Sequence, residues 1–377
     1  MTAVARWAPR LAGALLTAAL VGCAGGSPRP KPAELPPNVD LIGVRQAWQA
    51  KLAAPIGFPL QVHAQGNQVV VAGNDGAVVT IDADSGRELG RASAGAALTA
   101  GVGSDGWVSA VVTRANQVVA LEGGRELWRH RLATQSYTAP LVAGGRVFVL
   151  GADRSLVALD GRSGALLWSL QRPAEPLVLR QAGVLLPVGN TLVAGLAGRL
   201  AGINPDDGRV LWEAPLASAR GTNDVERLVD LVGGVDRQGS VVCARAFQTA
   251  VGCVDTATGA VRWSRPANGA TGIAGDGERL YGAESDGRLL AWGADTGDRA
   301  WSNERLKWRE LTGTLVLGRS VVVGDGTGLV HLFSRQDGSA LSRLSTDGSG
   351  IAATPVAAGN TLVVVTRAGG VYGFRPE

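Results

Sequence analysis

The sequence is poor in the residues from which most catalytic and metal centres are built. It contains three histidines, three cysteines and one methionine in 377 residues, and aromatic residues make up 5% of the chain. His63, His130 and His331 lie far apart, and none has a Cys, His or acidic partner at zinc-site spacing. A nucleophile elbow and a P-loop are also missing from the sequence. These absences predict a protein without catalytic residues, a metal ion or another cofactor.

The N-terminal apolar run is too short to span a bilayer, which requires ~20 residues. It covers residues 11–21, follows Arg6 and Arg10, and ends in Leu-Val-Gly-Cys at residues 20–23. A short basic region, an apolar stretch and small residues before a cysteine resemble the lipobox of bacterial lipoproteins. We therefore predict that residues 1–22 are a lipoprotein signal peptide. An ordinary secretory signal followed by a chance cysteine is the alternative.

Acylation of Cys23 would anchor the mature chain in a membrane. Ala24, directly after it, resembles the sorting residue of lipoproteins kept in the outer membrane, which implies a lipid-anchored protein on the periplasmic face of that membrane. Residues 24–38 contain five prolines and no periodic apolar pattern. Such a composition favours an extended chain, so residues 23–38 are predicted to be the lipidated cysteine and its tether.

Charge of neither sign dominates the sequence. It contains 36 Lys and Arg residues against 32 Asp and Glu residues, without a long basic run. Nucleic-acid binding is therefore not expected. Glycine is abundant instead, with 54 residues, about twice the usual share of ~7%. Glycine-rich and valine-rich sequence with scattered tryptophans is typical of many short strands joined by tight turns.

An internal repeat carries the strongest structural signal. Residues 146–168 form a strand, a polar turn, a second strand, an Asp-x-x-x-Gly turn and a third strand that ends in Trp168. The turn glycine recurs at these positions: Gly86, Gly124, Gly164, Gly208, Gly259, Gly297 and Gly338. A period near 40 residues, with one weaker strand before each unit, matches the four-stranded antiparallel blade of a β-propeller. The tryptophan four residues after most of these glycines is predicted to pack between neighbouring blades.

The two ends of the chain complement each other. Seven units are complete, whereas the C-terminal residues 361–374 lack the final strand. The N-terminal residues 44–52 resemble the last strand of another unit, residues 124–132. We predict that this N-terminal strand completes the last blade, because ring closure removes two exposed sheet edges. The fold class is therefore all-β, with an eight-bladed β-propeller over residues 39–377.

Two cysteines lie symmetrically about a predicted hairpin. Cys243 and Cys253 flank residues 246–250, so a hairpin centred there places them opposite each other on neighbouring strands. Such a pair is close enough to form a disulfide, and the periplasm is oxidising. We hypothesise a Cys243–Cys253 disulfide.

Long connections between blades are the best candidates for a binding surface. Two of them follow Trp168 and Trp212, so they emerge on the same face of adjacent blades, and the second carries an insertion of about ten residues. Loops on a rigid scaffold often carry binding residues. We expect an exposed apolar centre formed by Leu177, Leu179, Leu228 and Leu231. Spacing alone leaves open whether these leucines bind a partner or pack onto the propeller. A third long loop, residues 302–312, carries Trp308 on the same face.

Two loop motifs carry a family resemblance. The pattern Leu-x-Ala-Leu-Asp-x-x-x-Gly-x-x-x-Trp at residues 156–168 resembles PQQ-like propeller repeats, and with the lipobox the mature chain is similar to the BamB family of the outer-membrane β-barrel assembly machinery. Residues 176–180 resemble the family's Leu-x-Leu-Arg segment, and residues 221–230 resemble its Glu/Asp-Arg-Leu-x-Asp segment. The resemblance implies a scaffold that binds the periplasmic POTRA region of the barrel protein BamA. It assigns the contacts to Leu177, Leu179, Arg180, Arg227 and Asp230.

One feature of the family pattern is missing. Some relatives have a second aspartate two residues after the first, and this chain has Val232 there. The resemblance therefore does not extend to an acidic pair.

Other functions remain open at this point. A propeller lipoprotein could bind a different envelope partner, such as peptidoglycan, a polysaccharide or another protein complex. Unfolded outer-membrane proteins could pair with a free sheet edge, although the sequence singles out no edge. Quinone-dependent dehydrogenases share the repeat, but they carry an adjacent Cys-Cys pair that is absent from this sequence.

Overall fold

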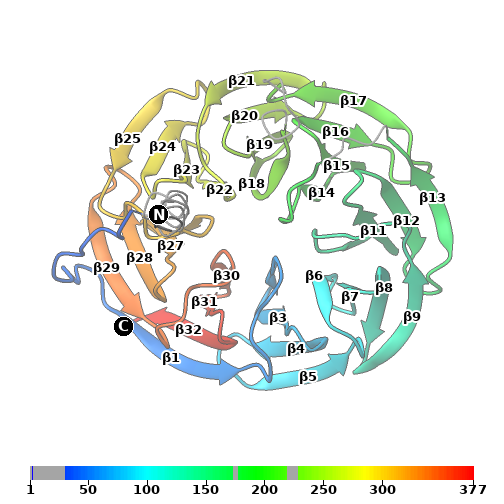
Figure 1. Ribbon diagram of the computed structural model, residues 1–377, viewed down its shortest axis with the longest axis horizontal. Helices are drawn as coiled ribbons and strands as arrows, with labels where there is room; N and C mark the ends of the chain where they lie inside the picture. Colours follow the sequence, from blue (N-terminus) through cyan, green and yellow to red (C-terminus); the bar gives the residue numbers. More distant parts are fainter. Residues whose placement is uncertain (1, 3–29, 173–176, 219–227) are drawn as a thin grey trace. The chain divides into compact units, whose positions relative to one another are not determined.

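The described part of the protein is built from strands alone. The computed structural model describes residue 2 and residues 30–172, 177–218 and 228–377. Residues 33–377 form one compact unit, in which 32 strands form eight four-stranded antiparallel sheets arranged in a ring (Figure 1). This architecture confirms the predicted eight-bladed β-propeller. Within the described ranges, no helix is long and apolar enough to cross a membrane.

The blades follow one another along the chain, and the strands of each blade run from the inside of the ring to its rim. Blades 1 and 2 contain β2 (His63–Gln65), β3 (Gln68–Ala72), β4 (Ala77–Asp82) and β5 (Glu88–Ser93), then β6 (Leu98–Ser104), β7 (Val108–Thr113), β8 (Gln117–Glu122) and β9 (Arg125–Arg131). Blades 3 and 4 contain β10 (Leu141–Ala143), β11 (Arg146–Leu150), β12 (Leu156–Asp160) and β13 (Leu166–Leu170), then β14 (Leu185–Val188), β15 (Thr191–Leu196), β16 (Arg199–Ile203) and β17 (Val210–Pro215).

The second half of the ring repeats this order. Blades 5 and 6 contain β18 (Leu231–Gln238), β19 (Val241–Ala246), β20 (Ala250–Asp255) and β21 (Ala260–Pro266), then β22 (Ile273–Gly275), β23 (Arg279–Ala283), β24 (Leu289–Gly293) and β25 (Arg299–Asn303). Blades 7 and 8 contain β26 (Leu315–Leu317), β27 (Ser320–Gly324), β28 (Leu329–Ser334) and β29 (Ala340–Ser345), then β30 (Val356–Ala358), β31 (Thr361–Val365), β32 (Gly370–Pro376) and β1 (Val44–Lys51).

Strand direction divides the ring into two faces. Because neighbouring strands are antiparallel, the turn between the first and second strands and the turn between the third and fourth lie on one face, which we call the turn face. The turn between the second and third strands and the connection to the next blade lie on the other, which we call the loop face. The described parts of the two connections singled out in the sequence, residues 171–172 and 177–184 and residues 216–218 and 228–230, therefore both belong to the loop face.

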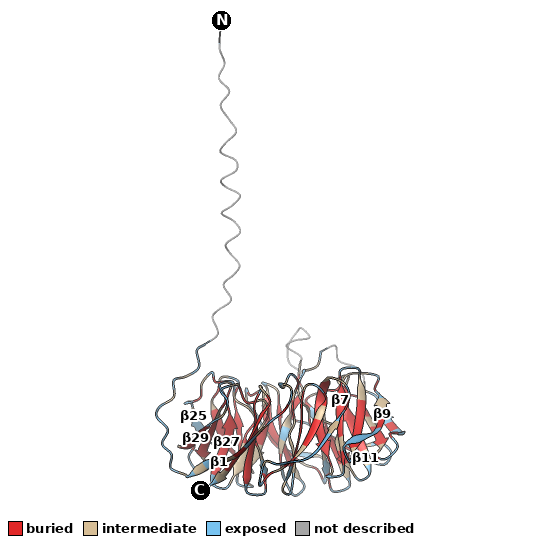
Figure 2. Cartoon of the chain, turned by 90° about the horizontal axis from the view of Figure 1, so that it is seen from below, coloured by how far each residue is buried: buried red, intermediate tan, exposed pale blue. Residues whose placement is uncertain are grey.

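The core lies between the blades and is formed by their middle strands. The second and third strands are apolar and almost fully buried, as in β11, where Val147, Phe148 and Val149 are at most 3% exposed. The fourth strands are mostly exposed along the rim, and buried residues fill the interior of each blade (Figure 2). Strands buried on both faces read as continuous runs of Val, Leu and Ala, which is why the sequence repeat is so regular.

The N-terminal strand closes the ring. β1 pairs with β32 in antiparallel register from Val44 opposite Pro376 to Lys51 opposite Gly370, with a shift between Gln46 and Trp48. The predicted closure of the last blade by an N-terminal strand is therefore confirmed. It joins the two ends of the described propeller in one sheet.

Tryptophans on the fourth strands connect adjacent blades, as predicted. The ring of Trp128 in blade 2 lies against Gly164 in the third turn of blade 3, so close that a Cβ on this glycine would be 2.6 Å from it. Gly164 has a φ of 70°, which favours glycine for a second reason. The indole Nε1–H of Trp128 donates to the carbonyl of Gly161 at 2.9 Å. The same ring-on-glycine contact joins Trp48 with Gly86, Trp168 with Gly208, Trp212 with Gly259, Trp263 with Gly297 and Trp301 with Gly338.

One junction without a tryptophan is explained by the chain ends. Blade 8 has no turn between its third and fourth strands, because these strands belong to opposite ends of the chain. Ser342 of blade 7 therefore has no turn glycine to cover, and its hydroxyl donates to Asp40 Oδ1 at 2.8 Å instead. The neighbouring Leu41 N–H donates to the carbonyl of Leu341 at 2.7 Å. The segment before β1 occupies the place of the missing ring.

The last six residues of the predicted tether, 33–38, belong to the compact unit and pack on the propeller. Ala33 N–H donates to the carbonyl of Lys307 at 2.9 Å, and Arg309 Nη1 donates to the carbonyl of Ala33 at 3.0 Å. Arg343 Nη1 donates to the carbonyl of Pro36 at 3.1 Å. The boundary therefore lies at residue 33 and not at residue 39. Proline-rich sequence still presents main-chain carbonyls, which arginines of blade 7 and of the preceding connection bind. Cys23 and the predicted signal peptide lie outside the described residues, apart from residue 2.

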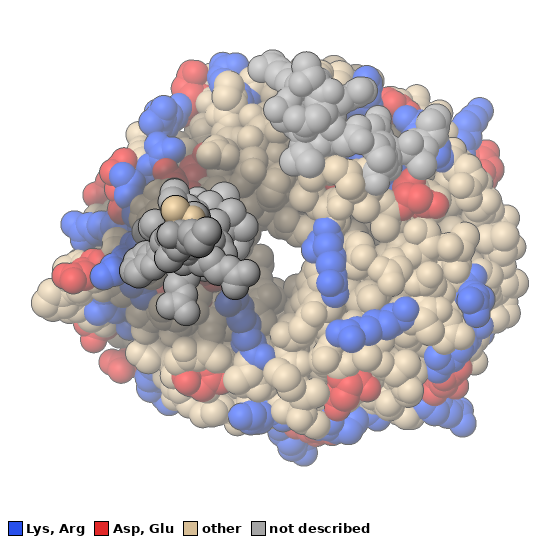
Figure 3. Space-filling model, viewed as in Figure 1, with Lys and Arg blue, Asp and Glu red and all other residues tan. Residues whose placement is uncertain are grey.

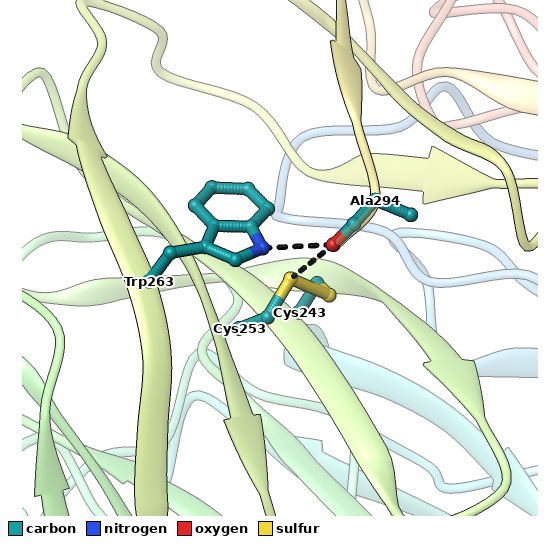
Figure 4. The surroundings of a disulfide bond; sticks show 4 residues. All are labelled: Cys243, Cys253, Trp263 and Ala294. Carbon is teal, nitrogen blue, oxygen red and sulfur yellow. Dashed lines mark hydrogen bonds between the residues drawn. A yellow bond between two sulfur atoms is a disulfide. The ribbon is translucent and has the colours of Figure 1, made fainter. Parts of the chain in front are cut away.

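The two hypothesised disulfide partners lie opposite each other in blade 5. Cys243 in β19 pairs with Cys253 in β20, with their Cα atoms 4.0 Å apart. Their sulfur atoms are joined at 2.02 Å, under the indole of Trp263 (Figure 4). The Ala294 carbonyl of blade 6 accepts a 2.8 Å hydrogen bond from Trp263 Nε1 and lies 3.9 Å from Cys253 Sγ. The disulfide thus lies at the junction between blades 5 and 6.

Candidate functional site

The loop face brings the two predicted binding segments together. The connection from blade 3 to blade 4 presents Leu177, which is 40% exposed, and Arg180, which is also exposed. Leu179 between them is half-buried. Asp230 ends the next connection and lies beside this segment. Arg227 lies outside the described residues, so its predicted partner contact stays a prediction.

Asp230 connects the two loops. Its Oδ1 accepts hydrogen bonds from Arg154 Nε at 3.2 Å and from Arg154 Nη2 at 3.0 Å. Its Oδ2 accepts a hydrogen bond from the main-chain N–H of Leu179 at 3.0 Å. Only 16% of the Asp230 side chain and 9% of the Arg154 side chain are exposed. The carboxylate that the resemblance assigned to a partner is thus engaged within the chain, where it holds the Leu177–Arg180 segment in place.

Arg154 was missed by the sequence reasoning, because its position in the repeat is not distinctive. It lies in the turn between the second and third strands of blade 3 and has a φ of 63°. The equivalent turns have a glycine with positive φ in blades 1, 6, 7 and 8, and a non-glycine residue with positive φ in blades 2, 4 and 5, namely Asn116, Ala197 and Gln248. A left-handed L-residue costs roughly 1–2 kcal/mol, and the partly buried ion pair with Asp230 offsets this strain. Arg154 also reaches the carbonyl of Leu177 at 3.4 Å, so one side chain supports both loops.

Arg180 is oriented by an aromatic ring. Its guanidinium carbon lies 5.8 Å from the centroid of the Tyr137 ring, within the range of a cation–π contact. Tyr137 is half-buried, and its hydroxyl donates to Gln135 Oε1 at 2.6 Å. No sequence motif pointed to Tyr137, which lies in the connection that precedes β10. The contact restricts an otherwise flexible arginine on the surface.

The exposed apolar centre is smaller than predicted. Leu231 is the first residue of β18 and is 3% exposed, and Val232 is 1% exposed. Leu228 is half-buried. The reason is that β18 begins one residue after Asp230, which turns the following side chains into the core. Among the residues that the structure describes in these loops, the exposed surface consists of Leu177 and Arg180, with Leu179 at the edge of a cleft of about 50 Å³ between Tyr137, Arg154 and Asp230.

The third long connection contributes a further exposed ring. Trp308, between β25 and β26, is 43% exposed and has a φ of 62°. It lies on the same face of the ring as Leu177, because both follow the last strand of a blade. The loop is held by Arg309, whose Nε donates to the buried Asp325 at 2.7 Å.

The described residues contain no cluster of three or more His, Cys, Asp or Glu side chains that could hold a metal ion. His331 does have an acidic partner that sequence spacing did not reveal, because its Nε2 lies 3.0 Å from Asp325 Oδ2. An opening at the centre of the ring is visible in Figure 3. Basic and acidic side chains alternate around the rim in that view, and neither sign forms a continuous field.

Comparison with known proteins identifies the family. A family model described as outer membrane protein assembly factor BamB matches residues 74–303. The chain is 37% identical over 340 residues to the assembly factor BamB of Burkholderia pseudomallei, covering 89% of each protein. It is 36% identical over 363 residues to BamB of Bordetella pertussis, covering 95% of this chain and 94% of that one. The chain belongs to the BamB family.

Solved structures agree with this family at the level of the fold. The crystal structure of BamB from Moraxella catarrhalis superposes with a TM-score of 0.81 at 24% identity, covering 88% of this chain and 99% of that one. The quinohemoprotein alcohol dehydrogenase of Comamonas testosteroni superposes with a TM-score of 0.69 at 14% identity, covering 90% of this chain and 78% of that one. The BamB and dehydrogenase families therefore share the propeller, and the loops must distinguish them.

Proposed function

We propose that this chain is a non-catalytic scaffold lipoprotein of the outer-membrane β-barrel assembly machinery, and that its loop face binds the POTRA region of a BamA-like barrel protein. It assists the folding and insertion of outer-membrane β-barrel proteins from the periplasmic face, where acylated Cys23 anchors it. The names of its relatives, which are outer membrane protein assembly factors, support the process. The site rests on the residues of the loop face.

The Arg154–Asp230 ion pair is the main structural support for the proposed binding site. It fixes two connections from adjacent blades against each other through Leu179 N–H and the Leu177 carbonyl. A surface fixed in advance loses little conformational entropy on binding. Leu177 supplies an exposed apolar contact, and Arg180 supplies a charge held over Tyr137. Arginine is enriched among interface residues that dominate affinity, and an exposed leucine beside it adds apolar surface to be buried on binding.

A pull-down from detergent-solubilised membranes tests both the partner and the site. The tagged lipoprotein is compared with a Leu177→Ala/Arg180→Ala variant. A matched control, Leu211→Ala/Arg209→Ala, removes an exposed leucine and an exposed arginine from blade 4, near the turn face. We expect the wild type and the control to recover a POTRA-bearing barrel protein, and the loop variant to recover roughly tenfold less or lower still.

The possible outcomes distinguish a wrong partner from a wrong binding site. If the wild type recovers no POTRA-bearing protein, the assembly function is wrong for this chain, and another envelope partner such as peptidoglycan or a polysaccharide becomes the better candidate. If the loop variant and the control recover equal amounts, the partner is right but the site is wrong. An Arg154→Ala variant adds a further test, because it should weaken recovery by releasing the loops without changing any exposed side chain.

The anchor is tested separately. A Cys23→Ser variant removes the thiol that would be acylated. We expect the wild type in the outer-membrane fraction and the variant in the soluble periplasmic fraction. Equal membrane recovery of both proteins would contradict the lipid anchor.

A further inference from the structure

The junction between blades 1 and 2 differs from the other junctions of the ring. At six junctions a fourth-strand tryptophan covers a turn glycine of the next blade. In blade 1 the equivalent residue is Gly90 in β5, opposite Thr80 in β4. The residues opposite the six tryptophans are small, namely Ala120, Ala158, Gly202, Cys253, Ala291 and Gly373. Blade 1 thus lacks both the ring and the small residue that accommodates it.

The neighbouring turn is also shortened. The third turn of blade 2 is a two-residue hairpin, Gly123–Gly124, between β8 and β9. Both glycines are exposed. A Cβ built on Gly90 would have no heavy atom within 4 Å. Open space therefore remains around Gly90, and the turn itself is approached by the main chain of β5, since a Cβ on Gly124 would be 3.2 Å from the carbonyl oxygen of Arg91.

This space is a groove of about 500 Å³ that opens between the two blades. Its floor is formed by Val70, Val78 and Leu121, which are 2–5% exposed, and by the Gly123–Gly124 turn. Polar residues, including Thr80, Arg91 and Ser109, line it as well. Leu89 is 43% exposed. Trp107 stands at the rim in the turn between β6 and β7 and is 81% exposed, more than any other large apolar side chain among the described residues. Isolated exposed apolar residues are ordinary, but an exposed tryptophan and an exposed leucine beside an open groove of mixed polarity are typical of an interaction site.

We propose that this groove binds a tryptophan side chain presented by a segment of a partner polypeptide. The six equivalent junctions show which group fits such a space, because each holds a tryptophan that is carried on a strand and lies against a turn glycine of the next blade. Five of these indoles donate to a main-chain carbonyl of that turn. The partner's ring takes the place that the chain's own ring fills elsewhere, against Gly90 and the Gly123–Gly124 turn.

The groove is separate from the proposed partner site. Trp107 and Gly123–Gly124 lie in the first and third turns of blade 2 and hence on the turn face, whereas Leu177 and Arg180 lie on the loop face. The inference therefore does not depend on the proposed function. Occupation of both sites at once is sterically compatible, because they open in opposite directions.

A plugged variant tests the inference. Gly90→Trp/Thr80→Ala introduces the ring and the small opposite residue that the other junctions have. The full mature chains carry Cys23→Ser, so that they have no lipid and need no detergent. They are titrated against an acetylated pentapeptide whose central residue is 5-fluorotryptophan. The fluorine resonance of the peptide is followed by NMR. The matched control is Leu166→Ala, which removes an exposed leucine of β13 outside the groove.

We expect the resonance to shift and broaden with the wild type and the control, and the plugged variant to bind roughly tenfold more weakly or not at all. An unlabelled tryptophan peptide should displace the probe, whereas its alanine analogue should not. The plugged variant should also unfold at a higher temperature, because the new ring fills an existing space. It should still recover the POTRA-bearing protein, and the Leu177→Ala/Arg180→Ala variant should still bind the peptide.

Three results would overturn the inference. One is an unchanged resonance with millimolar wild-type protein. Another is equal binding by the wild type and the plugged variant. The third is sedimentation showing that Trp107 of a second copy fills the groove in a dimer that Trp107→Ser abolishes. If the plugged variant fails to fold, Leu89→Ser and Trp107→Ser replace it, since both should weaken peptide binding without changing the junction.

Discussion

At the scale of single residues, stability in this propeller depends on pairs that join one blade to the next. Each tryptophan contributes a large buried ring, and each turn glycine provides the surface on which the ring lies. Neither residue can change alone, because a Cβ on Gly164 would enter the ring of Trp128. The pair therefore couples adjacent blades, together with apolar contacts and with polar contacts such as the buried ion pair between Arg245 and Glu284 at 2.9 Å.

Replacement of Trp128 should be costly. We expect Trp128→Ala to lower the free energy of unfolding by about 3–5 kcal/mol, because it leaves a cavity at a blade junction and removes the hydrogen bond to Gly161. Trp107→Ala is the control, since Trp107 is 81% exposed and exposed substitutions usually change stability by ~0.5 kcal/mol or less. Urea denaturation of both variants checks the expectation. Equal effects would mean that the ring at residue 128 does not hold the junction.

The disulfide makes a second prediction at this scale. Cys243 and Cys253 enclose a short loop, for which the chain-entropy model gives a stabilisation of about 2–3 kcal/mol. Cys243→Ala/Cys253→Ala should therefore lower the free energy of unfolding by that amount without changing the fold. In a thiol assay, the denatured and unreduced mature protein should show no reactive thiol at these positions. Two reactive thiols would contradict the disulfide.

At the scale of elements, the turn between β27 and β28 organises both blade 7 and the segment before β1. Asp325 is fully buried and accepts hydrogen bonds from Arg309, His331, Thr327 and the N–H of Leu329. Burial alone would raise the pKa of Asp325, but these donors hold it well below the usual carboxyl range. Arg309 in turn binds the carbonyl of Ala33. One carboxylate thus links a turn, a strand, a loop and the N-terminal segment.

His331 should make stability depend on pH. Burial lowers the pKa of His331 below 6.5, despite the opposing influence of Asp325, and Arg309 and Arg343 also disfavour its charged form. The unfolded chain takes up the proton first as the pH falls, so the folded state loses stability below about pH 6.5. We expect the free energy of unfolding to fall between pH 7 and pH 5, and His331→Gln to reduce this slope. The slope should not vanish, because burial lowers the pKa of His63 as well. An unchanged slope in the variant would contradict the assignment.

The elements themselves were largely predictable, and the contacts between loops were not. Each blade repeats the same order of strands and turns, with a tryptophan and a turn glycine at fixed positions. The roles of residues such as Trp168 and Gly208 could therefore be predicted from the sequence. Arg154 and Asp230 are 76 residues apart, and no periodic pattern connects them. Leu231 was predicted to be exposed because the start of β18 cannot be read from a loop of irregular composition.

At the scale of the whole molecule, the ring is held closed by the antiparallel pairing of β1 with β32. Without this pairing, blade 8 would end at β32 and expose its edge. Unpaired edges template aggregation. The number of blades could be predicted because the N-terminal and C-terminal fragments add up to one unit. The start of the compact unit at residue 33 could not, because it depends on arginines that bind main-chain carbonyls.

Truncation tests the closure. We expect deletion of residues 24–51 to lower the unfolding temperature strongly and to cause aggregation, because β32 loses its partner. Deletion of residues 24–32 is the matched control and should leave stability unchanged, since the compact unit begins at Ala33. Light scattering during thermal unfolding checks both. Similar behaviour of the two truncations would show that β1 is dispensable for closure.

The binding of Ala33 to the propeller limits the distance between the propeller and a lipid anchor at Cys23. Ala33 is bound at Lys307 and Arg309, in a connection on the loop face, so nine residues, or ten Cα-to-Cα steps, separate it from Cys23. An extended chain reaches at most ~3.3–3.6 Å per residue, which gives a working radius of about 35 Å around the anchor. If Cys23 is acylated, as proposed, Ala33 stays within that radius of the bilayer, so the propeller cannot diffuse freely through the periplasm. A partner in the same membrane would then meet the propeller at a raised effective concentration.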